Sequence, residues 1–229
     1  WNGLLGGFAL AALFAVNPFS LGIHAGGRGW ISHIGAAPFL VFAYYFVRIP
    51  WLAGLLVGIA SGMLYYPAFL FPLWLGYFWK RKSLSQTLQF AAAFAFVGVV
   101  CLIMILTMTK PSDSSHEGMS SLEAFLEDTI IQQQFSEAYG QSGFSFWGQY
   151  PTLRDRLKPV VTRGYLLFCL LLLFWPRGQN EQKLVCLSTA VLIGTQLCLS
   201  HGGGMYVGFY LAYFVMMMGH PPLTESQPE

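Results

Sequence analysis

Charged residues are scarce in this sequence. Lys, Arg, Asp and Glu together make up 10% of its 229 residues, whereas an ordinary soluble domain carries about 25%. A water-soluble surface cannot be built from so few charges, so the composition predicts a chain embedded in a lipid bilayer. The formal net charge of +2 is too small to indicate a nucleic-acid partner, and we predict none.

Acidic residues are missing from the first 112 positions, because the first Asp or Glu is Asp113. Seven of the ten acids lie between residues 113 and 155, in a segment that separates two hydrophobic runs. This segregation predicts a solvated loop over residues 109–158. One of its carboxylates could be a general base, but no pair of acids has a motif spacing, and acids on a solvated helix usually only solubilise it.

Cysteine chemistry and the common catalytic motifs are also lacking. All four cysteines lie inside apolar runs and lack metal-ligand spacing: Cys101, Cys169, Cys186 and Cys198. We therefore expect neither a disulfide framework nor a zinc site. A P-loop, a serine-hydrolase elbow and H-E-x-x-H are absent. We predict no cofactor, while a divalent metal is left open. The chain begins Trp-Asn-Gly without a signal-peptide pattern, so we expect it to be the C-terminal part of a longer protein.

Long hydrophobic runs fill most of the chain. They cover residues 3–16, 34–47, 51–79, 90–108, 160–175, 184–199 and 205–218. The run 51–79 would be about 43 Å long as one helix, which is too long for a bilayer core of about 30 Å. Its Tyr-Tyr-Pro interruption at residues 65–67 predicts two short helices, 51–64 and 67–79, either spanning or re-entrant.

These runs predict an all-α protein, a multi-pass transmembrane helical bundle of about eight passes. Residues 1–219 form the predicted transmembrane domain, and the polar, Pro-containing tail 220–229 is expected to be disordered. Within the loop, Ser120-Ser-Leu-Glu123 matches a capping box. Apolar residues at helical spacing follow it, which predicts an amphipathic surface helix over residues 120–140.

Basic clusters indicate the orientation. The cluster Lys80-Arg81-Lys82 belongs on the cytoplasmic side by the positive-inside rule. Counting passes from it returns Arg177 and Lys183 to the same side, and places the acidic loop and His201 outside. This predicts a multi-pass protein of the inner or plasma membrane. If 51–79 made one pass instead of two, the loop of residues 24–33 would be cytoplasmic.

Two glycine-rich loops are candidate binding sites. One contains His24, Arg28 and His33, and a guanidinium among glycines suits a phosphate ligand. The other joins Gln196 to Ser200-His201-Gly-Gly-Gly, where a histidine could contact a phosphate or handle a proton. Each loop also has a purely structural interpretation. The first could be an interfacial turn with a snorkelling Arg, and the second a glycine turn with a hydrogen-bonded His.

A third candidate lies at the end of the acidic loop. Trp147 and Gln149 could offer an exposed stacking face to a sugar acceptor, or they could belong to the aromatic belt of a membrane protein. The next cations, Arg154, Arg156 and Lys158, precede a span on the outer side. The positive-inside rule disfavours cations there, which makes these three residues candidates for contact with lipid phosphate.

The sequence resembles the C-type integral-membrane glycosyltransferases, and is most similar to family 87, which is polyprenol-phosphate-dependent and mannosyltransferase-like. The resemblance rests on LAGLLVGIA at residues 52–60, the aromatic-Pro break, the basic cluster, FWGQYP at 146–151 and HGGGMYVGFYL at 201–211. It implies transfer of a sugar from a polyprenyl-phosphate donor to a glycan or lipid acceptor at the extracytoplasmic face.

The basic and glycine-rich loops, together with the resemblance, predict roles for individual residues. His24, Arg28, His33 and His201 would contact the donor phosphate or sugar, and Trp147 and Gln149 the acceptor. The family's base is an Asp or Glu in its first outer loop, which has no counterpart before Asp113; the catalytic residue is therefore unknown and expected in a preceding segment. Met63 stands where relatives often carry Lys.

Two other classes of protein fit the same hydropathy. A secondary transporter or channel could use the short broken helices as a midplane site, although no Asp, Glu or Lys lies centrally in a predicted span. A non-catalytic membrane assembly subunit is the third class.

Overall fold

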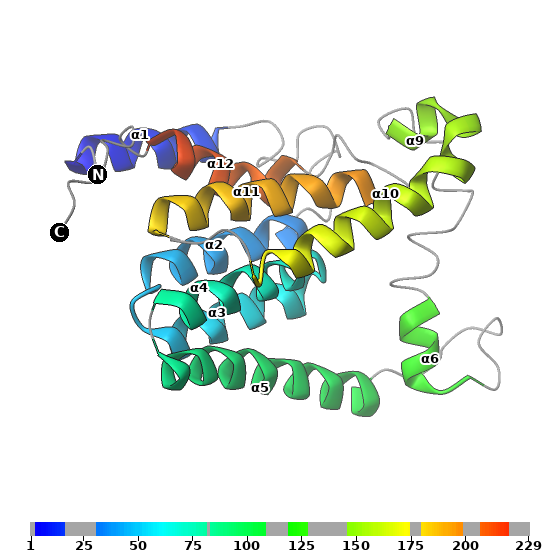
Figure 1. Ribbon diagram of the computed structural model, residues 1–229, viewed down its shortest axis with the longest axis horizontal. Helices are drawn as coiled ribbons and strands as arrows, with labels where there is room; N and C mark the ends of the chain where they lie inside the picture. The colour runs from blue at the N-terminus through cyan, green and yellow to red at the C-terminus, as the bar shows by residue number, and fades with distance from the viewer. Residues whose placement is uncertain are drawn as a thin grey trace.

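The chain folds into a layered bundle of helices (Figure 1). The computed structural model describes residues 3–16, 31–81, 83–108, 119–127, 146–174, 180–198 and 207–219. Every regular element in these ranges is a helix, which confirms the all-α prediction. The longer helices are α1 (Gly3–Ala15), α2 (Ile31–Tyr45), α3 (Pro50–Met63), α4 (Phe71–Arg81), α5 (Leu84–Met108), α10 (Pro151–Leu171), α11 (Glu181–Cys198) and α12 (Val207–Gly219).

The hydrophobic run 51–79 is broken where the sequence predicted. Helix α3 ends before Leu64, which is extended (φ −147°, ψ 130°), and a short 3-10 helix η2 (Tyr66–Leu70) leads into α4. Proline occupies the first turn of both α3 and η2, where its missing N–H removes no helical hydrogen bond. The prediction of two short helices is therefore confirmed.

A glycine stripe on α3 packs against α5. Gly54, Gly58 and Gly62 recur every four residues and therefore share one face of the helix. A Cβ on Gly54 would lie 2.3 Å from the carbonyl oxygen of Phe90, and one on Gly58 would lie 3.0 Å from Cβ of Val97. Small residues at this spacing let two helix backbones approach closely. This role of the glycines in LAGLLVGIA was not predicted from the sequence, where the segment contributed only to the family resemblance.

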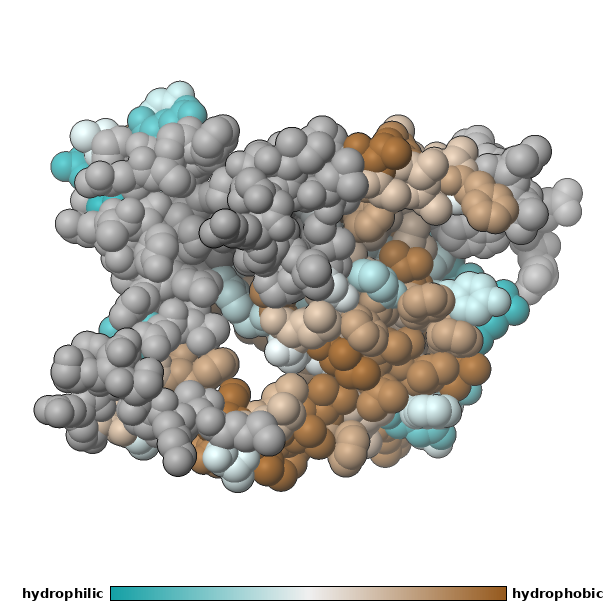
Figure 2. All heavy atoms as spheres, turned by 180° about the vertical axis from the view of Figure 1, so that it is seen from behind, coloured by the Kyte–Doolittle hydropathy of each residue, from teal (hydrophilic) through white to brown (hydrophobic). Residues whose placement is uncertain are grey.

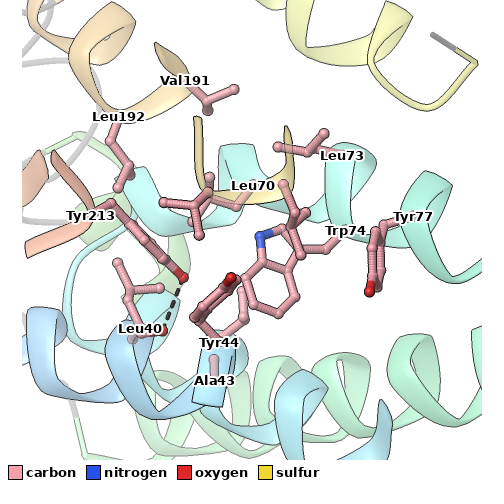
Figure 3. Close-up of a cluster of buried hydrophobic side chains, with 14 of the residues drawn as sticks. Leu40, Ala43, Tyr44, Leu70, Leu73, Trp74, Tyr77, Val191, Leu192 and Tyr213 are labelled. Carbon is pink, nitrogen blue, oxygen red and sulfur yellow. Dashed lines mark hydrogen bonds between the residues drawn. The ribbon is translucent and has the colours of Figure 1, made fainter. Parts of the chain in front are cut away.

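The core lies between α2, α4, α11 and α12 (Figure 3). Trp74 of α4 is fully buried, and its indole N–H donates to the Ser188 hydroxyl across 3.1 Å. Tyr213 of α12 is also fully buried, and its hydroxyl donates to the carbonyl of Leu40 across 2.9 Å. A buried polar group without a partner is costly, so these two hydrogen bonds let large amphipathic rings fill the core and fix how the helices meet.

Three segments rich in charge meet at one end of the bundle. Arg48 follows α2 and forms an ion pair with Glu181 at the start of α11, Nε to Oε1 3.6 Å. Lys80, near the end of α4, donates to the carbonyl of Phe174, just after α10. Helices α4 and α10 therefore end together there, while α3 and α11 begin there.

Large apolar side chains cover much of the surface. On α5, exposed residues recur around the helix away from α3: Phe96, Val99, Leu102, Ile103 and Leu106. Figure 2 shows the corresponding brown surface along the lower part of the molecule, where Figure 1 places α5. Within the described part of the chain, one helix, Leu84–Thr107, is long and apolar enough to cross a membrane, and three shorter apolar helices accompany it. About eight passes remains a prediction.

Several helix boundaries differ from the predicted runs. Helix α5 starts at Leu84 instead of residue 90, and α10 starts at Pro151 instead of residue 160. Both extensions are polar, so hydropathy alone could not include them. In the surface loop, α6 (Ser121–Leu126) begins as predicted. The rest of the predicted helix 120–140 falls beyond residue 127 and, like the tail 220–229, lies outside the described residues.

Candidate functional site at the N-terminal end of α10

The predicted donor-site residues lie mostly in segments that the structure does not describe. His24, Arg28 and His201 fall outside the described ranges. His33 lies in the first turn of α2, where the backbone alone is described. Helix α2 ends near Arg48, so His33 is at the opposite end of the bundle from the Arg48–Glu181 ion pair. That these four residues form one site remains a prediction.

Helix α6 begins with the predicted capping box. The backbone N–H of Glu123 donates to the Ser120 hydroxyl at 3.3 Å, and the Glu123 carboxylate accepts from the backbone N–H of Ser120 at 2.8 Å. The hydrogen bond from the Ser120 backbone, followed by that from its hydroxyl, lowers the pKa of Glu123. The carboxylate is thus used in starting the helix, which supports the solubilising and structural role over that of a general base.

Trp147 is an internal anchor. It lies in the short helix α9 (Phe146–Gln149), is only 2% exposed, and its indole N–H donates to the carbonyl of Leu197 across 2.7 Å. Leu197 is in the last turn of α11, where carbonyls have no partner within the helix. The expectation of an exposed stacking face at Trp147 is therefore wrong, because the ring is used to cap α11. Gln149, at the end of α9, is exposed.

A partly buried lysine lies beside this anchor. Lys158 of α10 is only 9% exposed, and Arg154 precedes it by one helical turn. Burial lowers the pKa of Lys158, the nearby positive charge of Arg154 lowers it further, and the Cys198 thiol acts in the opposite direction. The N-terminal half of α10 therefore places two cations next to the C-terminal end of α11.

The cluster lies at the end of α11 that comes just before the glycine-rich sequence of residues 200–204. Helix α11 ends at Cys198, and His201 follows three residues later in the sequence. The cluster of Trp147, Arg154 and Lys158 is at the opposite end of α10 from Phe174, which contacts Lys80. In the predicted orientation it is the outer end. Hydropathy had indicated Arg154, Arg156 and Lys158 as outer cations, but not which of them is buried.

Gln196 adds a buried polar group to the last turn of α11. Both its amide nitrogen and its amide oxygen are buried, and no hydrogen-bond partner for them was found among the residues described. It shares a helix face with Leu192, one turn earlier, and Leu192 lies in the core beside Tyr213 (Figure 3). An amide of this kind is suited to a ligand with hydroxyl or carbonyl groups.

The fold and this site define a class: an all-helical protein with an apolar surface and a semi-buried cationic cluster at one end of the bundle. Comparison of the chain with protein-family models, curated proteins and solved structures found no match in any of the three. Across the described ranges, no three His, Cys, Asp or Glu side chains gather as they would around a metal ion.

Proposed function

We propose that the chain is a multi-pass integral membrane protein, with the Arg48–Glu181 end cytoplasmic and the Lys158 end outside. The exposed apolar residues of α5 and the shorter apolar helices support this, because soluble proteins rarely expose apolar patches of this size. The glycine stripe on α3 supports it as well, since close packing of small residues holds helices together where water does not drive association.

We propose further that this protein is part of a glycosyltransferase that uses a polyprenyl-phosphate sugar donor and acts at the extracytoplasmic face. The observation that carries the proposal is the semi-burial of Lys158 beside Arg154. A cation withdrawn from water gains from an anionic ligand, and a phosphate at the membrane boundary supplies one. The resemblance to family 87 points to the same chemistry.

In this proposal, individual residues bind different parts of the donor and the acceptor. Lys158 and Arg154 would hold the donor phosphate, together with His24, Arg28, His33 and His201. Gln196 would hydrogen-bond the sugar, and Gln149 would contact a glycan or lipid acceptor. Trp147 would act as a positioning residue, because it ties α9 to the end of α11.

Sugar transfer by the parent protein in proteoliposomes tests the proposal. With polyprenyl-phosphate mannose as donor, Lys158→Gln should raise the donor KM at least about tenfold, as for loss of one charge-assisted hydrogen bond. Lys183→Gln, an exposed cation at the other end of the bundle, is the matched control and should leave KM unchanged. Transfer by the Lys158→Gln protein at the normal donor KM would refute the site.

Secondary transport is the second candidate, and the buried Gln196 amide favours it. Polar side chains inside membrane helices commonly mark a substrate path. Flux of a sugar-containing solute across the proteoliposome membrane without a covalent product would establish transport, and its loss in Gln196→Leu would place the path at α11. If neither flux nor sugar transfer is detected, the result would favour the non-catalytic assembly subunit.

A further inference from the structure

A cavity lies far from the Lys158 cluster, in the groove between α1, α2 and α12. Its volume is about 830 Å³. The walls are almost entirely apolar and include Leu10, Phe14, Val41, Phe42, Val215 and Met216. A cavity of this size and lining suits a hydrocarbon chain. Phe42 and Tyr45 on its wall are exposed, so the groove is open to the surroundings of the bundle.

Two opposite charges stand at one end of this groove. Arg48 and Glu181 both line it, and their side chains are 81% and 35% exposed. They approach through a single contact, Nε to Oε1 at 3.6 Å. An exposed ion pair of this length contributes little to stability, so the two groups can turn to a ligand at small cost. The outer edge of the guanidinium offers further N–H donors, and the carboxylate offers acceptors.

We propose that this groove binds phosphatidylethanolamine from the cytoplasmic leaflet. Its acyl chain would occupy the groove, its phosphate would accept from Arg48, and its primary ammonium would donate to Glu181. Phosphatidylcholine carries the same two charges, but its quaternary ammonium has no N–H to donate. Phosphatidylglycerol lacks the ammonium and brings its phosphate beside the Glu181 carboxylate, which repels it. The pair of charges therefore selects an amine-bearing zwitterionic lipid over both.

This inference is independent of sugar transfer and depends only on the proposed membrane location. The groove ends at Arg48, on the opposite end of the bundle from Lys158. A lipid bound here is therefore structural or regulatory and does not compete with the donor. Loss of lipid selectivity and loss of transferase activity can be observed separately.

Native mass spectrometry of the chain, released from micelles containing equal amounts of the three lipids, tests the proposal. One phosphatidylethanolamine should be retained at least about fivefold more than either other lipid, as for one partly exposed charge-assisted hydrogen bond. Equal retention of the three lipids, or preference for phosphatidylglycerol, would overturn it.

Steric variants locate the bound lipid. Gly7 lines the groove on α1, and a Cβ placed there meets no atom within 4 Å. A Phe side chain can therefore leave α1 at this position without a clash at its Cβ, and its ring would take up space in the groove, so Gly7→Phe should reduce phosphatidylethanolamine retention severalfold. Gly98 on α5 is also exposed, and a Cβ added there meets no atom within 4 Å, but it lies outside the groove. Gly98→Phe is the matched control, and equal retention by the two variants would contradict the assignment.

Charge variants test how the lipid headgroup is recognised. Glu181→Gln should abolish the preference for phosphatidylethanolamine over phosphatidylglycerol, because the repulsion of the second lipid and the ionic acceptor for the first disappear together. Arg48→Gln should lower retention of all three lipids, since each carries a phosphate. Circular dichroism and a monodisperse elution profile verify that each variant is folded. Unchanged selectivity in a folded Glu181→Gln protein would refute the proposed recognition.

Discussion

Replacing Gly54 by Ala should separate α3 from α5. The added Cβ would lie 2.3 Å from the carbonyl oxygen of Phe90 and 3.1 Å from its Cα. A carbon and a carbonyl oxygen need about 3.3 Å, so the two helix backbones must move apart by about 1 Å. Both atoms are backbone, so no side-chain rotation can relieve the contact. Overpacking of this kind costs about 1–3 kcal/mol, and we expect about 2 kcal/mol for Gly54→Ala.

The same substitution at other glycines provides graded controls. A Cβ on Gly58 would be 3.0 Å from Cβ of Val97, so Gly58→Ala should cost less. Gly98 has no atom within 4 Å, and Gly98→Ala should be neutral or stabilising by up to about 1 kcal/mol, because Ala favours the helix over Gly. The three variants share one chemical change, so they differ only in the contact made.

Equilibrium unfolding in mixed micelles with increasing dodecyl sulfate, followed by tryptophan fluorescence and circular dichroism, measures these differences. The expected order of the free energy of unfolding is Gly98→Ala highest, then Gly58→Ala, then Gly54→Ala. Equal stabilities for Gly54→Ala and Gly98→Ala would show that α3 and α5 do not pack through this stripe. The reasoning on helix association would then be refuted.

Three further predictions concern α6, α9 and the first half of α10. Trp147→Phe keeps an apolar ring but removes the donor to the Leu197 carbonyl, so it should lower the free energy of unfolding by about 1–2 kcal/mol, whereas substitution of an exposed stacking residue would leave the unfolding midpoint unchanged. The pKa of Glu123 is lowered by the hydrogen bonds that it accepts from Ser120. The capping contribution to stability is therefore present above the unfolded pKa of about 4.3 and is lost as pH falls through the lower folded pKa. The amide ¹⁵N shift of Ser120 should titrate at this folded pKa, and an unshifted pKa would contradict the cap. The pKa of Lys158 is lowered by burial and by Arg154, and an anionic ligand would raise it, so donor affinity should fall as pH rises through a pKa below about 10.4. Equilibrium donor binding measured from pH 7 to 10 should show this fall, and Lys158→Arg should abolish it. A fall that persists in Lys158→Arg would assign the titration to another group.

Local features of the fold were readable because their causes are local. The break at residues 65–67 follows from Tyr-Tyr-Pro, and the start of α6 follows from Ser120 and Glu123, which contact each other directly. Extensions of α5 and α10 were missed because hydropathy stops at polar residues while a helix continues through them. Arg154 and Lys158 therefore fell in a predicted loop, although the structure places them one turn apart on a helix.

The candidate site was predictable in type but not in arrangement. Sequence alone indicated outer cations and an aromatic segment before a span, yet it could not distinguish buried Trp147 from an exposed stacking ring. Burial depends on which face of α9 meets α11, and that rotation is set by contacts 50 residues apart in the chain. No pattern within the aromatic segment encodes it.

Sequence by itself determined that the protein is all-helical and apolar, and where its helices break. Composition, proline positions and capping act within a few residues, so each can be read along the chain. Tertiary structure alone decided that the glycines of α3 meet Phe90 and Val97, that Lys158 is withdrawn from water beside α11, and that Arg48 and Glu181 close one end of an apolar groove. These depend on how helices rotate and pair, which is fixed by packing between residues distant in sequence.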